Sequence, residues 1–504
     1  MRKFVLILTL CLSLTCLLAG AGLTEEKVKV AMPVTRGEIA STGTHGRGFT
    51  PPPFDLSESV PKAGYNYASE KRSAPRQYPG SFKLPYVTPV KNQESCDVCW
   101  IFASVASLEG KVNDVANGTA NPAYSEQNIK NCQLDIQPGK NRCKKLGDSF
   151  MATAYLTTNG AVQESCDPYD TSQNTNCKTS CPVQVFPAEM RVISAGSMAA
   201  NDDIKYALTT YRAPVIASIY SEGMDYAAGG PAVCGGDSQD TDHLVVIVGW
   251  DDTKPANGPC PPGAWLIKNS WGTNWGDAGY FWMGYQQRLA GTWTNVYSAY
   301  RTPYTGETIY HHDLGCNAYT YGWQNTNYAA VIFTAGQSET LRRVEFETSK
   351  PNSTYEIKVF STWNGPSTAP SNQLGTTKTG SFSHSGFYSV ELDTPITLPS
   401  GSSFVVQVTT STAGGDGYGF YFDNGHLPGP AGVSYISNNG KDWSDTATFK
   451  NKGIGPVIVH AVTSGSQTPS VQPSDGVWKN QETNLNVYYQ TYDTGSAICV
   501  ASSD

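Results

Sequence analysis

The stretch that decides the fold is VTPVKNQESCDVCW, residues 87–100. Two cysteines, Cys96 and Cys99, stand three positions apart, and apolar residues after Cys99 recur with the spacing of one helix face. We therefore predict a helix over residues 99–112 whose first turn carries Cys99. Free N–H groups and the dipole at a helix N-terminus favour a thiolate. Because acyl transfer needs such a nucleophile, Cys99 is the candidate.

The spacing of the two cysteines leaves other chemistries open. A C-x-x-C motif also occurs in redox pairs and as half of a zinc site. A zinc site would need a second pair of ligands with matching spacing, and Cys177 with Cys181 is the nearest approach to one. The motif therefore has to be judged with the residues that accompany it.

A cysteine nucleophile needs a base, and His243 is the one histidine between residues 80 and 300. It stands just before an apolar run at residues 244–248 that we expect to form a buried strand. A lone histidine at a strand edge is more often a packed core residue. Since Cys99 has no other candidate partner in this part of the sequence, we favour His243 as the base.

Two further side chains can complete the chemistry. Asn269 follows a second expected strand at residues 264–267, and its side-chain oxygen can accept a hydrogen bond from the imidazole. Trp271 could shield that bond from water. Gln93 can donate from its amide to a forming oxyanion, with the backbone N–H of Cys99 as the second donor.

Several blocks of the sequence, in this order, resemble the papain family of cysteine peptidases. They are Gln93 with Cys96-Asp97-Val98-Cys99-Trp100, then Ser125-Glu126-Gln127, then Asp242-His243, and then the run from Lys268 to Gly276 with Trp271 and Trp275. The resemblance covers about residues 83–300. It implies an α+β fold of two lobes, a helical lobe beside a β-barrel-like lobe, with an extended peptide held between them.

The resemblance also implies roles for individual residues. Cys99 and an imidazolium His243 would form the reactive pair, with Asn269 orienting the ring and Gln93 stabilising the oxyanion. The tryptophans of the motifs, Trp100, Trp271 and Trp275, would support the site. A disulfide between Cys96 and Cys143 is implied as well.

This sequence departs from the family beside the nucleophile. Glu94 and Asp97 stand where the family has glycine, and acidic groups near a thiolate disfavour it, although exposed charges are screened. The glycine-rich stretch that lines the family's cleft is replaced by residues 143–147, with Gly147 as the candidate cleft residue. We expect Lys144 and Lys145 in this stretch to bias the cleft toward acidic peptides.

The thirteen cysteines indicate an oxidising compartment. Two lie in the N-terminal apolar segment, so eleven remain after its removal and one thiol stays unpaired. With Cys99 as that thiol, ten cysteines can pair. We expect two bridges of open connectivity among Cys132, Cys166, Cys177 and Cys181, and we place Cys234 with Cys260 and Cys316 with Cys499 from their locations.

The N-terminus and the composition indicate export. Residues 1–21 combine a basic start, an apolar run and small residues at the end, as in a secretory signal peptide. The run is shorter than the ~20 residues of a membrane span, so we expect no stable membrane insertion after cleavage. The net charge of -8 argues against a nucleic-acid partner. We predict a secreted or cell-surface protein.

We divide the chain into a signal peptide (1–21), a pro-region or linker (22–80), a papain-like domain (81–302), a β domain (303–463) and a linker with a β-like tail (464–504). Short alternating strands between turns predict that the β domain is a sandwich or jelly roll. It resembles the lectin-like β-sandwich that follows some secreted peptidase domains. In the pro-region, residues 51–54 are our candidate for an extended plug of the cleft.

The function predicted from these residues is that of a secreted cysteine endopeptidase acting on a protein or peptide. We expect a monomer without cofactor or bound metal, with glycan binding through the β domain as an open option. His311-His312-Asp313 could ligate a metal, but adjacent residues of a strand alternate sides, which favours a structural role. The alternative is a weakened papain-fold binding or adhesion protein. A third hypothesis is a transglutaminase-like enzyme, but the sequence block that contains Asn269 argues against it.

Overall fold

The computed structural model describes residues 45–52 and 78–465. Short stretches inside this range are left out: 134–140, 172–176, 196–198, 222–223, 225, 236–240, 259, 286, 289, 314–316, 324–325, 413–418, 425–429 and 453. The predicted signal peptide, Pro53 and Phe54 of the expected plug, and nearly all of the predicted tail lie outside the described residues. Within them, no helix has both the length and the apolar character that a membrane span requires.

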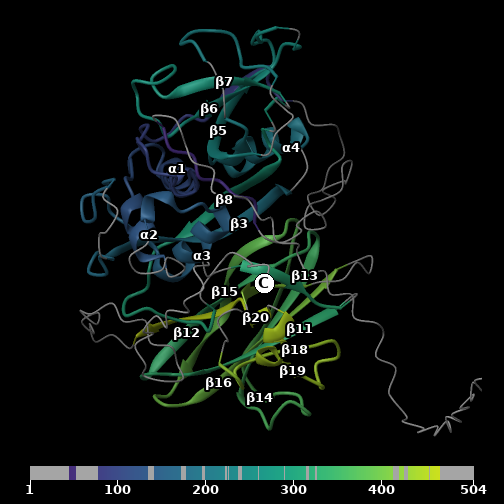
Figure 1. The fold of residues 1–504 in the computed structure, drawn as a ribbon. Coiled ribbons are helices and arrows are strands. Elements are labelled where there is room, and N and C mark those ends of the chain that lie inside the picture. The colour runs from purple at the N-terminus through teal and green to yellow at the C-terminus, as the bar shows by residue number, and fades with distance from the viewer. Residues whose placement is uncertain are drawn as a thin grey trace, which may run out of the picture.

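The helices lie in the first part of the chain; α1, α2 and α3 gather on the left of the strands in Figure 1, and α4 lies on the right. They are α1 (Cys99–Val115), α2 (Glu126–Cys132), α3 (Ser149–Asn159) and the short α4 (Asn201–Tyr206). The predicted helix is α1, which runs three residues beyond the expected end. The side chains of Ser125 and Asp148 cap α2 and α3, each accepting backbone N–H groups that the first turn leaves unpaired.

The strands of the first domain form a β lobe beside these helices (Figure 1). The strands are β1 (Ser81–Lys83), β2 (Ala161–Val162), β3 (Val183–Ala195), β4 (Val215–Ile219), β5 (His243–Asp251), β6 (Ala264–Lys268), β7 (Tyr280–Gly284) and β8 (Trp293–Arg301). The two predicted strands are present as β5 and β6, which pair antiparallel. Since both are buried almost throughout, their uninterrupted apolar runs are explained.

The second domain is all β. Its strands are β9 (Thr308–Tyr310), β10 (Asn317–Tyr321), β11 (Thr326–Thr334), β12 (Glu339–Thr348), β13 (Ser353–Thr362), β14 (Ser371–Phe382), β15 (Gly386–Leu398), β16 (Ser403–Thr412), β17 (Phe420–Asn424), β18 (Ser434–Ser437), β19 (Ser444–Asp445), β20 (Ile454–Val457) and β21 (Val459–Gly465). Six of them pair in the order β14-β13-β16-β11-β18-β19. One apolar cluster joins Val331 and Phe404 of this sheet to Val344 and Phe346 of β12 on the facing sheet, so the domain is a sandwich.

These elements confirm the predicted fold class, a helix-containing lobe and a β lobe followed by an all-β domain. Strand β14 was not expected, because its sequence is polar and has no alternating apolar pattern. It lies at the edge of the six-stranded sheet and is largely exposed, where polar side chains are ordinary.

A feature absent from the prediction is that the two domains share one sheet. Strand β15 of the second domain pairs antiparallel with β3 of the first, with Gly386 opposite Arg191 and Tyr388 opposite Glu189. The larger sheet therefore runs from β10 in the second domain to β7 in the β lobe. Figure 1 shows the two halves of the molecule meeting at β3 and β15. Backbone hydrogen bonds thus couple the domains directly.

Gly386 makes this coupling possible, and its substitution tests it. Its φ is +137°, and a Cβ there would lie 1.9 Å from the backbone oxygen of Met190. We expect Gly386→Ala to lower the free energy of unfolding by about 3 kcal/mol, since it adds an overpacking cost to an unfavourable backbone conformation. Gly401→Ala is the matched control, because Gly401 also has positive φ but open space around it. If urea unfolding shows the same loss of unfolding free energy in both variants, the sheet edge shared by the two domains contributes little to stability.

Candidate active site

The nucleophile candidate and the base candidate meet where α1 packs against β5. Cys99 opens α1, and its Sγ accepts a hydrogen bond from the backbone N–H of Leu244 at 3.3 Å. Leu244 directly follows His243, the first residue of β5. Both Cys99 and His243 are fully buried. Two residues that are 144 positions apart in the sequence are thereby neighbours.

His243 is oriented by the third predicted residue. Its Nε2 lies 2.9 Å from Oδ1 of Asn269, so the ring donates this proton to the amide oxygen. Trp271 stacks on the imidazole with ring centroids 4.8 Å apart and is itself buried. Trp275 packs edge-on against Trp271. The indole shields the hydrogen bond from water, and Nδ1 of His243 is left without a hydrogen bond among the described residues.

Gln93 is held in a fixed orientation by a residue to which the sequence assigned no role. The hydroxyl of Ser270 donates to Oε1 of Gln93, so the amide must present its N–H groups on the other side. Nε2 of Gln93 donates to the backbone oxygen of Cys96 at 2.8 Å and to that of Gly46 at 3.1 Å. Ser270 lies inside the block Asn269-Ser270-Trp271-Gly272, and its place in this block was the signal in the sequence that could have indicated its role.

A segment of the expected pro-region, residues 45–52, lies across these groups. The carbonyl oxygen of Gly46 accepts from Gln93 Nε2 and also from Nε1 of Trp271 at 3.1 Å. The ring of His45 stacks on Trp271 with centroids 5.1 Å apart. A peptide carbonyl of the chain itself therefore occupies the donor that was predicted to bind an oxyanion.

Farther along, the segment pairs with Gly147. The N–H of Gly147 donates to the oxygen of Gly48 at 2.8 Å, and the N–H of Thr50 donates to the oxygen of Gly147 at 3.1 Å. The two strands run parallel, and the side chain of Phe49 is buried in the core of the first domain. Gly147 thus offers both backbone groups to a peptide, although the sequence around it departs from the family's glycine-rich stretch.

Glycine is required where the segment lies closest to the nucleophile helix. A Cβ on Gly46 would lie 1.9 Å from the oxygen of Cys96, and one on Gly48 would lie 2.1 Å from the oxygen of Asp97. Among the described residues the contact with the site is made by Gly46-Arg47-Gly48 and not by Pro51 and Pro52 of the expected plug, whose other two residues lie outside the described part of the chain. Prolines 51 and 52 only continue the segment beyond Gly147.

The segment keeps the reactive pair in its uncharged form. Burial raises the pKa of the Cys99 thiol well above its ordinary value, and Asp242 and Asp97 add to this. Burial also lowers the pKa of His243 to about 4, with Arg47 and His45 contributing. The helix N-terminus alone does not produce a thiolate here, because desolvation of the covered site outweighs it.

The acidic departure at position 97 has a structural partner. Asp97 is buried, its Oδ1 accepts the backbone N–H of Arg47 at 3.0 Å, and its Oδ2 pairs with Lys144 at 3.1 Å. The guanidinium of Arg47 lies 3.4 Å from Oδ2 of Asp242. Asp97 is therefore a buried carboxylate, and it adds to the raised pKa of the Cys99 thiol, as expected of an acidic group near a thiolate.

The predicted bias toward acidic peptides was based on two lysines, and both have defined surroundings in the structure. Lys144 is paired with Asp97, and Nζ of Lys145 is buried. Burial lowers the pKa of Lys145 to about 7. Among the described residues, the carboxylates of Asp97 and Asp242 contact the segment in the cleft.

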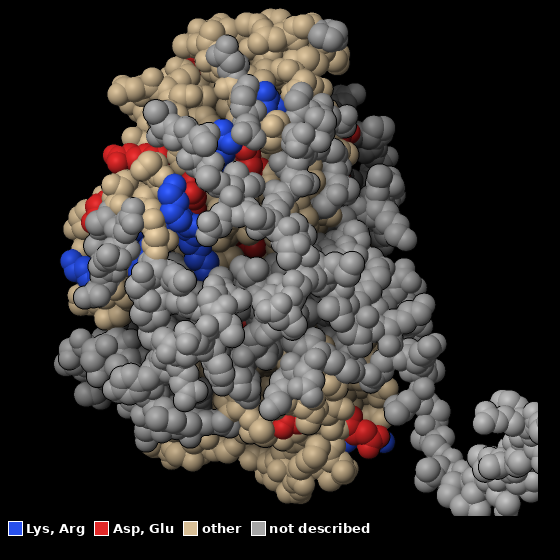
Figure 2. All heavy atoms as spheres, viewed as in Figure 1, with Lys and Arg blue, Asp and Glu red and all other residues tan. Residues whose placement is uncertain are grey.

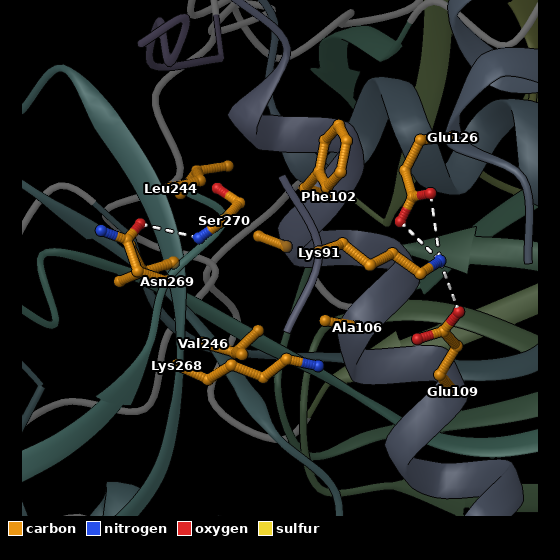
Figure 3. Close-up of a pocket in the computed structure, with 12 residues that line it drawn as sticks. Lys91, Phe102, Ala106, Glu109, Glu126, Leu244, Val246, Lys268, Asn269 and Ser270 are labelled. Atoms are coloured by element: carbon orange, nitrogen blue, oxygen red, sulfur yellow. Dashed lines mark hydrogen bonds and ion pairs between the residues drawn. The ribbon is translucent and has the colours of Figure 1, made fainter. Parts of the chain in front are cut away.

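Behind the site, a pocket between the lobes contains a buried ion network (Figure 3). Nζ of Lys91 contacts Glu109 at 2.7 Å and Glu126 at 2.9 Å, which ties the stretch before Gln93 to α1 and α2. Lys268 reaches into the same pocket from β6 and donates to Thr88 Oγ1 at 3.1 Å. Breaking such a buried pair is costly, so the network holds Gln93 and Asn269 at a fixed separation.

Disulfides surround the nucleophile within the described residues. The pairs are Cys96–Cys143, Cys132–Cys177, Cys166–Cys181 and Cys234–Cys260. This resolves the connectivity that the sequence left open. Cys99 is the free cysteine of this part of the chain. The remaining predicted pair, Cys316 with Cys499, lies outside the described residues.

Comparison with known proteins agrees with the fold and the geometry. Residues 77–300 match the family model described as papain family cysteine protease, and residues 309–463 match the lectin like domain model. The chain thus joins a papain-family peptidase domain to a C-terminal lectin-like domain. This confirms both resemblances found in the sequence.

Among curated proteins, a probable cysteine protease RDL6 of Arabidopsis thaliana is 31% identical over 199 residues, which are 38% of this chain and 51% of that protein. Cathepsin K of Mus musculus is 31% identical over 232 residues, which are 43% of this chain and 62% of that protein. The chain therefore spans about half to three-fifths of the length of these relatives.

Among solved structures, the clostridial cysteine protease Cwp84 after propeptide cleavage has a TM-score of 0.65 at 23% identity, covering 77% of this chain and 99% of that one. A structure of the cysteine protease and lectin-like domains of Cwp84, a surface layer associated protein of Clostridium difficile, gives 0.65 at 22% identity, covering 78% and 90%. At this identity the likeness concerns the fold, which includes both domains.

The close approach of Gly46 predicts how the site can be uncovered. In the intact chain, Gly46→Ala should increase the rate at which iodoacetamide labels Cys99 by roughly 5- to 30-fold, because overpacking against Cys96 displaces the segment. Gly80→Ala is the control, since a Cβ there meets no atom within 4 Å. Peptide mapping by mass spectrometry measures the labelling. The same rate in both variants would mean that the segment does not limit access.

Removal of the segment should also change the pH dependence of the thiol. Burial raises the pKa of Cys99 in the intact chain, so the thiolate that reacts forms only at strongly alkaline pH. After cleavage at a protease site introduced between residues 53 and 77, followed by removal of residues 45–52, this pKa should fall and that of His243 should rise. The alkylation rate plotted against pH should then shift its inflection to lower pH. An inflection that stays in place would contradict the assigned cause.

Proposed function

We propose that this protein is a cysteine endopeptidase, made as a precursor whose segment 45–52 covers the site. The observation that carries the proposal is the set of contacts at Gly46. Its carbonyl oxygen accepts from Gln93 and lies over a site that contains Cys99, His243 and Asn269. A peptide bond in this place is where acyl transfer would occur.

The mechanism follows from the residues around that carbonyl. With the segment gone, the Cys99 thiolate attacks the substrate carbonyl carbon and a C–S bond forms. The carbonyl oxygen becomes an oxyanion that Gln93 Nε2 and the Cys99 N–H stabilise. His243 gives its proton to the leaving amine, and the C–N bond breaks. Water then attacks the thioester with His243 as base, which releases the acid and restores Cys99.

The path of the segment favours action within a chain. On one side of Gly46, His45 stacks on Trp271, and on the other side Phe49 and Thr50 lie along Gly147. A cleft that holds backbone on both sides of the reactive position accommodates the interior of a polypeptide. Since the segment pairs in parallel with Gly147, a substrate bound in the opposite direction would present a different peptide bond to Cys99. For this reason we expect the segment itself to resist cleavage at Gly46.

We further propose that the protein acts outside the cell, free or at the cell surface, and is a monomer. The predicted signal peptide, the disulfides and the likeness to a surface layer associated protein support this location. The lectin-like domain supports glycan binding. The face seen in Figure 2 has few charged side chains of either sign among the described residues. The predicted domain limits, 81–302 and 303–463, remain part of the proposal.

The experiment that tests the function uses chain freed of the segment by an introduced protease site. A thiol-reactive peptidyl epoxide should label Cys99, and the protein should degrade casein. We expect Cys99→Ala to abolish both, and Gln93→Ala to lower kcat by about 10²–10³ while labelling persists.

His243→Ala should remove turnover without unfolding the chain, as circular dichroism would check. The proposal fails if the freed protein neither reacts with the epoxide nor cleaves casein under reducing conditions. That result would favour a binding protein on a papain fold.

A further inference from the structure

A second cluster of ionisable side chains lies at the junction of the two domains, away from Cys99. His311 and Asp313 follow β9, and His460 lies in β21, which pairs with β9. Ligand atoms of these three residues all lie within 4.8 Å of one another. Asp313 and His460 are both 1% exposed. His312 points elsewhere and stacks on Phe333, as the alternation of side chains along an extended chain requires.

One imidazole of the cluster is held as metal ligands usually are, and the other lies beside a carboxylate. Nδ1 of His311 lies 2.8 Å from the backbone oxygen of Asp313, so this nitrogen donates and Nε2 keeps its lone pair. Nδ1 of His460 faces Oε2 of Glu345 at 3.6 Å, while Nε2 faces Asp313. A ring that gives one N–H to a carbonyl or carboxylate presents the other nitrogen to a metal in a fixed direction.

The charges of the cluster do not balance without a cation. Arg301, the last residue of β8, pairs with Glu307 at 2.8 Å and with Glu345 at 3.0 Å. Together with Asp313, three buried carboxylates face one guanidinium among the described residues. A divalent cation bound by neutral imidazoles would bring this sum of charges to zero.

We propose that His311, Asp313 and His460 bind one divalent metal ion of the zinc class, with Glu345 orienting His460. Two imidazoles and a carboxylate suit zinc rather than calcium, which prefers oxygen ligands. His460 Nε2 and Asp313 Oδ2 are 2.9 Å apart. Tetrahedral bonds of about 2.0–2.1 Å need a separation of about 3.3 Å, so the ligands move apart by a few tenths of an ångström.

The ion would join the domains rather than take part in peptide hydrolysis. His460 and Glu345 belong to the lectin-like sheet, and Glu345 is bonded to Arg301 at the end of the last peptidase strand. A metal bound by His460 would thus also hold Glu345 in place, and the carboxylate of Glu345 is the charge that Arg301 neutralises. The competing arrangement has no metal. Burial opposes a charged His460, but Asp313 and Glu345 then raise its pKa to about 10.

The test uses the full chain without a polyhistidine tag, with Cys99→Ala to remove the active-site thiol as a zinc ligand. The protein is stripped with a chelator, equilibrated with Zn²⁺ or Ca²⁺, freed of unbound ion by gel filtration and analysed for metal. We expect about one zinc per chain, no calcium at this site, and a Tm at least about 4 °C higher with zinc.

Variants in the same background assign the site. His311→Gln and His460→Gln should lose the zinc and the rise in Tm, whereas His312→Gln, altered at the adjacent buried histidine, should keep both. If His460→Gln does not fold, the parent and His311→Gln are compared after loading with Co²⁺. A four-coordinate cobalt site absorbs visible light, so we expect this absorption in the parent and not in His311→Gln. No zinc in the parent, or equal zinc in both cluster variants, overturns the proposal.

Discussion

The active site depends on one contact between the lobes, the packing of the first turn of α1 against the start of β5. The backbone N–H of Leu244 donates to Cys99 Sγ, so the base candidate His243 is beside the nucleophile candidate. Cys99 and His243 belong to different lobes, so neither lobe alone brings the two residues together. The ion network of Lys91 with Glu109 and Glu126 joins the stretch before Gln93 to both helices, so it fixes Gln93 relative to α1.

Covering the site changes the chemistry of the same residues. Under segment 45–52 the thiol and the imidazole are desolvated and both are uncharged near neutral pH. The covering chain can come this close because Gly46 and Gly48 have no side chains. It also satisfies polar groups that water or substrate would otherwise satisfy, namely Gln93 Nε2 and Asp97. Segment 45–52 is thus held over the site by backbone hydrogen bonds together with the buried side chain of Phe49.

Much of the site could be predicted from local patterns, and what could not be predicted depends on contacts between distant segments. Cys99 and Asn269 lie in blocks whose spacing is specific, so the sequence identified them. The roles of Ser270 and Asp97 depend on Gln93 and Arg47, which approach only after folding. The plug was expected in the proline run, because no pattern in the sequence shows how closely a covering segment must approach the helix that carries Cys99.

The same reasoning explains what was predicted of the fold. The buried strands β5 and β6 have apolar runs and were predicted, whereas the exposed edge strand β14 has no such run. The pairing of β15 with β3 could not be read from either strand, because it depends on the docking of two domains.

The most direct test of the central claim is to trap the acyl-enzyme. Protein freed of residues 45–52 is mixed with an excess of an activated peptide ester, quenched in acid within milliseconds and mapped by mass spectrometry. The account predicts one acyl group, attached as a thioester to Cys99, that disappears as substrate is consumed. Turnover without an acyl group on Cys99, or an acyl group on another residue, would contradict it.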